Sequence, residues 1–173
     1  DPPELVLMWG SSGSGDGEFL YPRGIATDAH GNIYVTEESG YRVQKFDGEG
    51  NFLAKWGSYG SGDGQFDFPT SIATDVDGNV YVSDYYNNRI QKFDSEGNFL
   101  TKWGSTGSGD GQFYGVWSLA TDAVGDVYVV DDSNHRIQKF DSEGNFLAKW
   151  GGYGSGDGEF TFPHGVATDA DGH

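Results

Sequence analysis

Two histidines, His135 and His164, carry the side chains best suited to metal chemistry in this sequence, and two acids, Asp131 and Asp132, stand close before His135. Two imidazoles and a carboxylate form a donor set that zinc sites use. A metal site therefore requires a fold that brings these residues to one face. The alternative is simpler, because histidines on loops are usually just solvated.

The sequence contains no motif for other kinds of catalysis. There is no cysteine, which excludes thiol nucleophiles, disulfides and Cys-ligated zinc. Neither a G-x-S-x-G nor an H-E-x-x-H sequence is present. The phrase Gly-Ser-Gly-Asp-Gly lacks the Lys-Ser or Lys-Thr of a phosphate-binding loop, and the calcium-like stretch at 75–79 lacks the later ligands of an EF-hand. We expect both to be turns, and we expect no cofactor.

The composition limits the partners. The 173 residues contain 27 Asp plus Glu against 10 Lys plus Arg, a formal charge of −17. Such a surface repels phosphate backbones, so nucleic acid and anionic membrane surfaces are disfavoured partners. No apolar run approaches the roughly 18 residues that a membrane span needs, so no membrane insertion is expected. An aromatic content of 16% favours a folded domain over disorder.

The elements that must position these residues follow from an internal repeat. Four tryptophans recur every 47 residues, and so do the Asp and the Phe of the phrase Gly-Ser-Gly-Asp-Gly-x-Phe, without insertions. The repeated residues are Trp9, Trp56, Trp103 and Trp150; Asp16, Asp63, Asp110 and Asp157; and Phe19, Phe66, Phe113 and Phe160. A period of this length indicates a repeat architecture.

One period contains four short β-type runs, at 72–75, 80–83, 89–93 and 99–103, which we name strands a to d. Glycine-containing turns separate a from b and c from d, as tight antiparallel hairpins require. Four antiparallel strands in each copy predict an all-β fold, a β-propeller whose blades stand around a central channel.

The repeated phrases, among them Phe-Pro-x-x-Ile-Ala-x-Asp, Asn-Asn-Arg-Ile-Gln-Lys-Phe and Gly-x-Phe-Leu-x-Lys-Trp, resemble the NHL repeat family from about Leu5 to Gly172. The resemblance implies a propeller, usually of six blades. As a single propeller segment over 1–173, the chain supplies strand d at 4–9, blades at about 25–56, 72–103 and 119–150, and strand a at 166–170. We expect a part of a larger propeller; the alternative is a homo-oligomer joined through open blade ends.

Residues that recur in every blade are expected to build the blade. The repeated Trp and Phe side chains should pack between blades. Each repeated arginine should pair with the acid that ends strand b; the pairs are Arg42 with Glu37, Arg89 with Asp84, and Arg136 with Asp131. The phrase Gly-Ser-Gly-Asp-Gly should connect strand d to the next strand a, with its Asp as the acceptor of the turn.

Function should reside where the blades differ. The differing positions lie at the entry to strand a and in the b–c turn, which open on one face of a propeller. The expected ligand-binding residues there are Arg23, Tyr41, Thr70, Tyr85, Tyr86, Trp117, His135 and His164. Rigid aromatic and polar groups at a concave mouth are typical of recognition surfaces. Neutral drift on exposed loops is the alternative.

Four functions remain open on the sequence alone. The first is a non-catalytic binding module for a protein, peptide or glycan, outside the cell or on its surface. The second is a metal-dependent lyase or hydrolase that would use His135 and His164. The resemblance supplies a precedent, because it implies kinship with NHL-like lyases that hold a metal. The third is an RNA-binding propeller, as some NHL domains are, against which the charge argues. The fourth is a fragment or reconstruction of a repeat propeller that assembles without a ligand.

Overall fold

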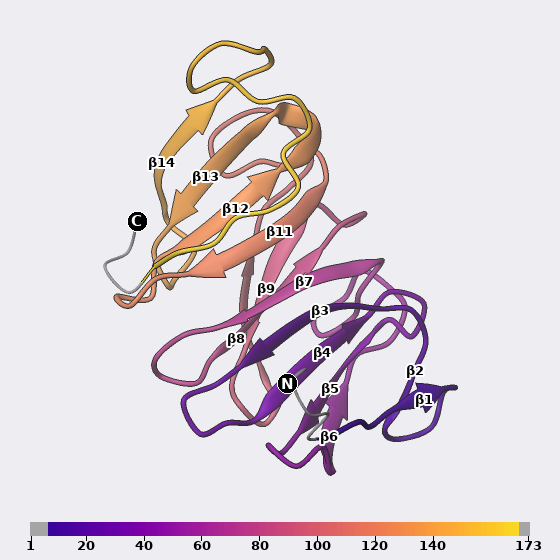
Figure 1. The fold of residues 1–173 in the computed structure, drawn as a ribbon. Coiled ribbons are helices and arrows are strands. Elements are labelled where there is room, and N and C mark those ends of the chain that lie inside the picture. The colour runs from indigo at the N-terminus through magenta and orange to yellow at the C-terminus, as the bar shows by residue number, and fades with distance from the viewer. Residues whose placement is uncertain (1–6, 170–173) are drawn as a thin grey trace, which may run out of the picture.

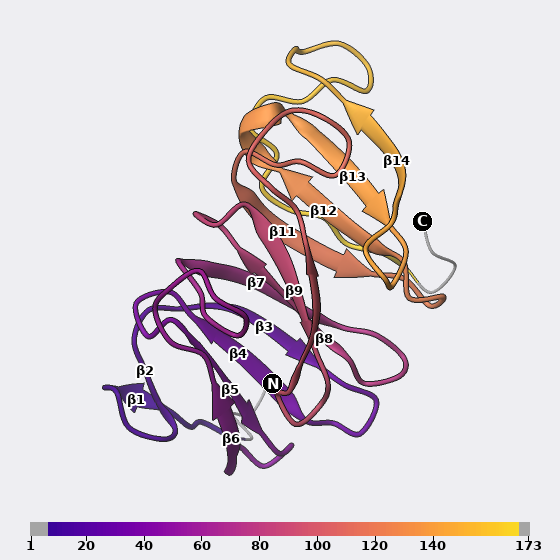
Figure 2. The ribbon, with the colours of Figure 1, turned by 180° about the vertical axis from the view of Figure 1, so that it is seen from behind.

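The computed structural model describes residues 7–169. They form three four-stranded antiparallel sheets, each with its strands in chain order. Figure 1 shows the sheets side by side as successive blades of an open arc, and Figure 2 shows the same order from behind. The predicted all-β propeller of four-stranded blades is confirmed. No helix within residues 7–169 is long and apolar enough to cross a membrane.

The blades have nearly identical strand bounds. Blade 1 consists of β3 (Pro22–Thr27), β4 (Ile33–Glu37), β5 (Arg42–Phe46) and β6 (Phe52–Trp56). Blade 2 consists of β7 (Pro69–Thr74), β8 (Val80–Asp84), β9 (Arg89–Phe93) and β10 (Phe99–Trp103). Blade 3 consists of β11 (Val116–Thr121), β12 (Val127–Asp131), β13 (Arg136–Phe140) and β14 (Phe146–Gly151). A short parallel pair, β1 (Ser11–Ser12) with β2 (Glu18–Phe19), precedes blade 1, and a 3₁₀ turn, η1 (Asp132–Asn134), follows β12.

Strand a of each blade begins three residues earlier than the sequence analysis placed it. In blade 2, Pro69 pairs with Asp84 and Ile72 with Val82, and the register shifts between the two pairs. A proline is tolerated there because the first residue of a strand need not donate to the ladder. The residues at the entry, including Thr70 and Trp117, are therefore part of a strand rather than of a free loop.

The outermost segments expected as strands contain none within the described residues. Residues 7–9 and 166–169 are irregular, while residues 4–6 and 170 lie outside the described part. Among residues 7–169, neither segment pairs with a neighbouring strand. Each still makes the contact that its counterparts make, since Trp9 packs on Phe46 at 4.5 Å between ring centroids and Thr168 bonds to the carbonyl of Thr121 at 2.7 Å.

A line of threonine hydroxyls ties the innermost strands together. Thr74 Oγ1 donates to the Thr27 carbonyl at 2.8 Å, and Thr121 Oγ1 donates to the Thr74 carbonyl at 2.7 Å. These bonds join β3 to β7 and β7 to β11, which are also in contact along their lengths. The repeat therefore fixes the spacing of neighbouring blades with one side chain per blade.

Aromatic side chains fill the space between blades, as predicted. Trp103 of blade 2 packs on Phe140 of blade 3 at 5.9 Å between ring centroids. It lies so close to Gly144 that a Cβ at this glycine would stand 2.6 Å from the indole ring. Trp56 makes the same contacts with blade 2. Trp150, at the outer end of blade 3, has no further blade beside it among residues 7–169 and is 42% exposed.

Each repeated arginine holds the loop before its own blade. In blade 2, Arg89 Nε donates to Asp84 Oδ2 at 2.7 Å, and its other nitrogens donate to the carbonyls of Ser61, Gly62 and Gln65 at 2.7–2.8 Å. The Asp84 side chain is fully buried, and its other oxygen accepts the backbone N–H of Asp67 at 2.7 Å. Burial raises the pKa of Asp84, while these hydrogen bonds offset part of that rise.

The other blades repeat this network, so the predicted pairs are confirmed. Arg42 bonds to Glu37 at 2.6 Å and Arg136 to Asp131 at 2.7 Å. The expected role of the loop aspartate is wrong. Asp63 forms an exposed ion pair with Lys102 at 2.5 Å, and the turn N–H of Gly62 bonds to Gln65 Oε1. The side chain of Gln65, which is longer than that of Asp63, reaches back over the turn and accepts this N–H. The Asp63 carboxylate instead contacts Lys102 of β10.

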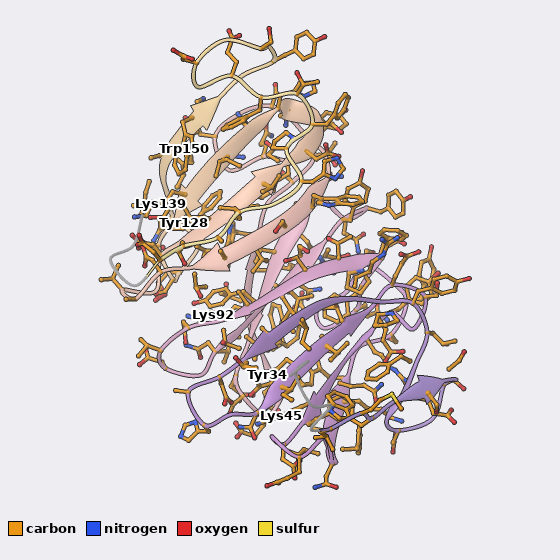
Figure 3. All side chains as sticks on the ribbon, in the orientation of Figure 1. Tyr34, Lys45, Lys92, Tyr128, Lys139 and Trp150 are labelled. Carbon is orange, nitrogen blue, oxygen red and sulfur yellow. The ribbon has the colours of Figure 1, made fainter. Side chains whose placement is uncertain are left out.

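At the edge of the blades that carries the c–d turns, a lysine joins blade 1 to blade 2. Lys45 Nζ lies 5.4 Å from the ring centroid of Tyr34 and donates to the Ser95 carbonyl of blade 2 at 2.9 Å. Lys139 of blade 3 lies over Tyr128 in the same way but pairs with Asp126 at 2.7 Å. Figure 3 shows both lysines beside their tyrosines.

Replacing one tryptophan at a time tests the packing between blades. We expect Trp103→Ala to lower the free energy of unfolding by about 3–5 kcal/mol, the usual cost of removing a packed aromatic side chain. Trp150→Ala, the same change at the equivalent position, should cost less than half as much because no blade within residues 7–169 covers this ring, which is 42% exposed. Denaturant unfolding followed by circular dichroism measures both. Equal losses would contradict the assigned role.

The buried pair can be compared with the exposed pair that holds the same loop. Arg89→Ala leaves the Asp84 carboxylate buried without its cation and should cost about 3–5 kcal/mol. Lys102→Ala removes only the exposed pair with Asp63 and should cost about 0–1 kcal/mol. The same unfolding measurement serves both variants. A Lys102→Ala loss as large as that of Arg89→Ala would refute the ranking.

Candidate functional site

The two kinds of loop that carry the candidate residues meet at one edge of the blades. In blade 2, the backbone N–H groups of Tyr85 and Tyr86 bond to the carbonyls of Phe68 and Asp67, both at 3.2 Å. In blade 3, the N–H of Asp132 bonds to the Gly115 carbonyl at 3.0 Å. The d–a connection therefore docks on the b–c turn. We call this surface, formed by residues 57–68, 85–88, 104–115, 132–135 and 152–164 with the entries to strand a, the loop face.

A continuous row of aromatic rings runs along the loop face across blades 2 and 3. We call its members, Phe68, Tyr85, Tyr86, Trp117 and His164, the ring row. Tyr85 contacts Tyr86 at 5.0 Å and Trp117 at 5.4 Å between ring centroids. Tyr86 contacts Phe68 at 5.1 Å, and Trp117 contacts His164 at 5.0 Å. Edge-to-face contacts of this kind hold each ring in place through its neighbours.

The ring row depends on one glycine that the sequence analysis did not single out. Tyr21, Phe68 and Phe162 occupy the same loop position with positive φ angles of 53°, 65° and 49°. Blade 3 has Gly115 there, also with a positive φ. A Cβ at Gly115 would lie 2.9 Å from the ring of Tyr85, so the glycine makes the space that this ring fills. The signal was an aromatic position that becomes Gly in one copy.

Phe68 was also missed, because three of the four copies carry an aromatic side chain at its position, as Tyr21, Phe68 and Phe162. Its ring extends the row toward blade 1, where the guanidinium carbon of Arg23 lies 5.7 Å from the Phe68 ring centroid. Arg23 also pairs with Glu38 in the turn of its own blade. Tyr41 stands apart from the row and packs on Tyr59 at 5.0 Å between ring centroids.

Thr70 does not lie at the surface. It is 8% exposed, and its hydroxyl bonds to Ser83 Oγ at 2.8 Å and donates to the Val116 carbonyl of blade 3 at 3.0 Å. The bulge at the start of β7 turns this side chain into the space between blades. It therefore joins blades and is not part of the loop face that a ligand could contact.

His135 serves the fold. Its Nδ1 accepts the backbone N–H of Phe162 at 3.1 Å, and its ring packs on Tyr153 and Phe162. In blade 2, Asn88 Oδ1 accepts the N–H of Gly115 in the same way at 2.8 Å. Residues 7–169 contain no group of three His, Asp or Glu side chains that could hold a metal ion. The site proposed for two histidines and an aspartate is not formed by these residues.

Asp132 is the unusual acid of the loop face. It is 7% exposed, and its Oδ1 is buried without a hydrogen-bond partner in the described part of the chain. Burial raises the pKa of Asp132, and electrostatic interactions with His164 and His135 offset part of that rise. Burial also raises the pKa of Tyr85, with a further contribution from the Asp132 charge. The carboxylate therefore lies within electrostatic reach of the ring row.

Comparison with known proteins identifies the repeat. The family model described as NHL repeat matches residues 19–46, 66–93 and 113–140, once in each blade. Protein lin-41 of Caenorhabditis elegans is 48% identical over 50 residues, which are 29% of this chain and 4% of that protein.

Two solved structures share the fold. Hydrazine synthase of Kuenenia stuttgartiensis superimposes with a TM-score of 0.69 at 13% identity, over 91% of this chain and 42% of that one. Streptogramin B lyase superimposes with a TM-score of 0.63 at 15% identity, over 88% of this chain and 46% of that one. The chain thus spans less than half the length of each of these three proteins. Since identities this low show the fold alone, the three repeat matches carry the assignment, and the chain belongs to the NHL-repeat β-propeller family.

Proposed function

We propose that the chain is a non-catalytic binding module whose loop face takes a protein, peptide or glycan ligand. The observation that carries this proposal is the ring row, a set of aromatic side chains from successive blades that share one edge of the molecule. The row presents both flat ring surface and polar groups. Tyr86, 60% exposed, offers its ring and hydroxyl to solvent, and His164 is exposed as well.

The rings are held before any ligand arrives. Tyr85 packs against Tyr86 and Trp117, and its ring fills the space left by the missing side chain of Gly115. Aromatic side chains that are already ordered lose little conformational entropy on binding, and they dominate the energetics of many recognition surfaces. A rigid scaffold that presents such rings at a loop edge is well suited to binding.

The opposite edge offers a contrast that supports the choice of face. Its c–d turns have nearly the same sequence in every blade, and their aspartates are used within the turn. In blade 2, Asp94 accepts the N–H groups of Glu96 and Asn98 at 3.0 and 2.8 Å. Side chains committed to turn geometry leave little for discrimination between ligands. The b–c turns and the entries to strand a on the loop face differ more between blades than these c–d turns do.

Association of two chains through their open blade ends is a second candidate, and two observations favour it. Trp150 is 42% exposed at the outer end of blade 3, and Ile25 is 66% exposed on the outer side of blade 1. In blade 2, which lies between the other two, the equivalent Trp103 and Ile72 are covered by neighbouring blades. A metal-dependent lyase is a weaker candidate, since it needs metal ligands from outside residues 7–169.

Selection of ligands from a random peptide library tests the binding module. We expect selected peptides to lose affinity at least about ten-fold for Tyr86→Ala, because exposed aromatic anchors carry a large share of binding energy. The matched control is Val124→Ala, which truncates an 80% exposed apolar side chain in the turn between β11 and β12 on the opposite edge. Fluorescence anisotropy of labelled peptides gives both affinities. Peptides that bind both variants equally well would place recognition elsewhere and contradict the proposal.

A further inference from the structure

A buried carboxylate without a partner needs a physical explanation. Asp132 is more than nine-tenths buried, and its Oδ1 has no hydrogen-bond partner among residues 7–169. An isolated buried charge is costly unless a cation or hydrogen-bond donors accompany it. The backbone gives this side chain little freedom to leave, because the N–H of Asp132 bonds to Gly115 and its carbonyl accepts the N–H of His135, both at 3.0 Å.

The repeat itself shows what is missing. Glu38 of blade 1 occupies the position equivalent to Asp132, and Arg23 at the entry of strand a supplies its cation. In blade 3 the residue equivalent to Arg23 is Trp117. The acid has therefore been kept in blade 3, while an aromatic ring stands in place of the cation that satisfies it in blade 1.

The surroundings of Asp132 suit a cation that comes from outside the chain. Tyr85 and Trp117 meet at 5.4 Å between ring centroids, and His164 packs on the other side of Trp117 at 5.0 Å. Faces of Trp and Tyr rings attract ammonium and guanidinium groups, most strongly where water is excluded. The N–H of Asp132 bonds to the Gly115 carbonyl, and a Cβ at Gly115 would lie 2.9 Å from the Tyr85 ring, so the carboxylate adds a full negative charge close to these rings.

We propose that Asp132, Tyr85 and Trp117 form a site for an organic ammonium group, with Asp132 as its counter-ion and the rings as its walls. The site lies on the loop face and would give the proposed binding module a ligand class, the organic ammonium compounds. This proposal therefore rests on the proposed function. The exposed His164 ring, on an irregular segment after β14, forms the outer boundary of the site. A ligand cation enters beside Trp117 and supplies the positive charge that Arg23 supplies in blade 1.

Choline and its neutral isostere 3,3-dimethylbutan-1-ol separate charge from shape. We expect choline to shift the indole N–H signal of Trp117 saturably in a nuclear magnetic resonance titration, with the signal assigned from Trp117→Phe. The isostere should bind at least about ten-fold more weakly, because it cannot use the carboxylate. Equal affinities for the two compounds would overturn the proposal.

Two charge-matched variants locate the charge. Asp132→Asn keeps the shape of the side chain and should weaken choline binding at least about ten-fold. Asp77→Asn removes the same charge from an exposed turn on the opposite edge and should leave the affinity unchanged within about two-fold. His164→Ala, on an exposed segment, provides a second loop-face variant should Asp132→Asn fail to fold, and its choline affinity should fall. Equal affinities of Asp132→Asn and Asp77→Asn, or an unchanged affinity of His164→Ala, would refute the site.

The outcome is independent of the test of the binding module. If library peptides lose affinity for Tyr86→Ala while choline shows no dependence on Asp132, the loop face binds ligands but the ammonium site is wrong. If choline binds through Asp132 while no peptide depends on Tyr86, the site stands and the proposed peptide ligand is wrong.

Discussion

The buried pair between an arginine and the acid at the end of strand b is the interaction on which the loop face depends. Burying two charges is costly, and it is tolerated here because nearly every donor and acceptor is used. Arg89 bonds to Asp84 and to three carbonyls of the preceding connection, while Asp84 also accepts a backbone N–H at the entry to strand a. The pair thereby fixes a glycine-rich segment that would otherwise be mobile.

This arrangement separates the residues that hold a loop from those that face solvent. The arginine anchors the connection from its buried side, and the side chains on the exposed side are free to differ between blades. The acid that follows strand b by one residue shows the consequence. Glu38 is paired with Arg23 within the chain, whereas blade 3 has Trp117 at the position of Arg23, and Asp132 has an oxygen without a partner among the described residues. The repeated framework tolerates such an exchange because neither residue takes part in the buried pair.

Much of the fold could be predicted from the sequence because the same pattern of strands and turns recurs in three complete copies. The spacing of 47 residues predicts the blades, and the opposite charges of Arg89 and Asp84 around a tight turn predict their pair. Contacts across blades were harder, since they join residues far apart in the chain. Nothing local indicates that Lys102 reaches Asp63, or that Thr70 bonds to the Val116 carbonyl of the next blade. The acceptor role of His135 could not be predicted either, because it appears only when the Phe162 N–H is placed beside it.

The most direct test of the account is to map where a selected peptide binds, by following backbone amide signals during a titration. We expect the perturbed amides to cluster at 67–68, 85–86, 115–117, 132–135 and 164, while the amides of the c–d turns stay unchanged. This pattern would place recognition on the variable side chains that the buried pairs support. Perturbations centred on the c–d turns, or on Trp150 and Ile25 at the outer blade faces, would contradict it.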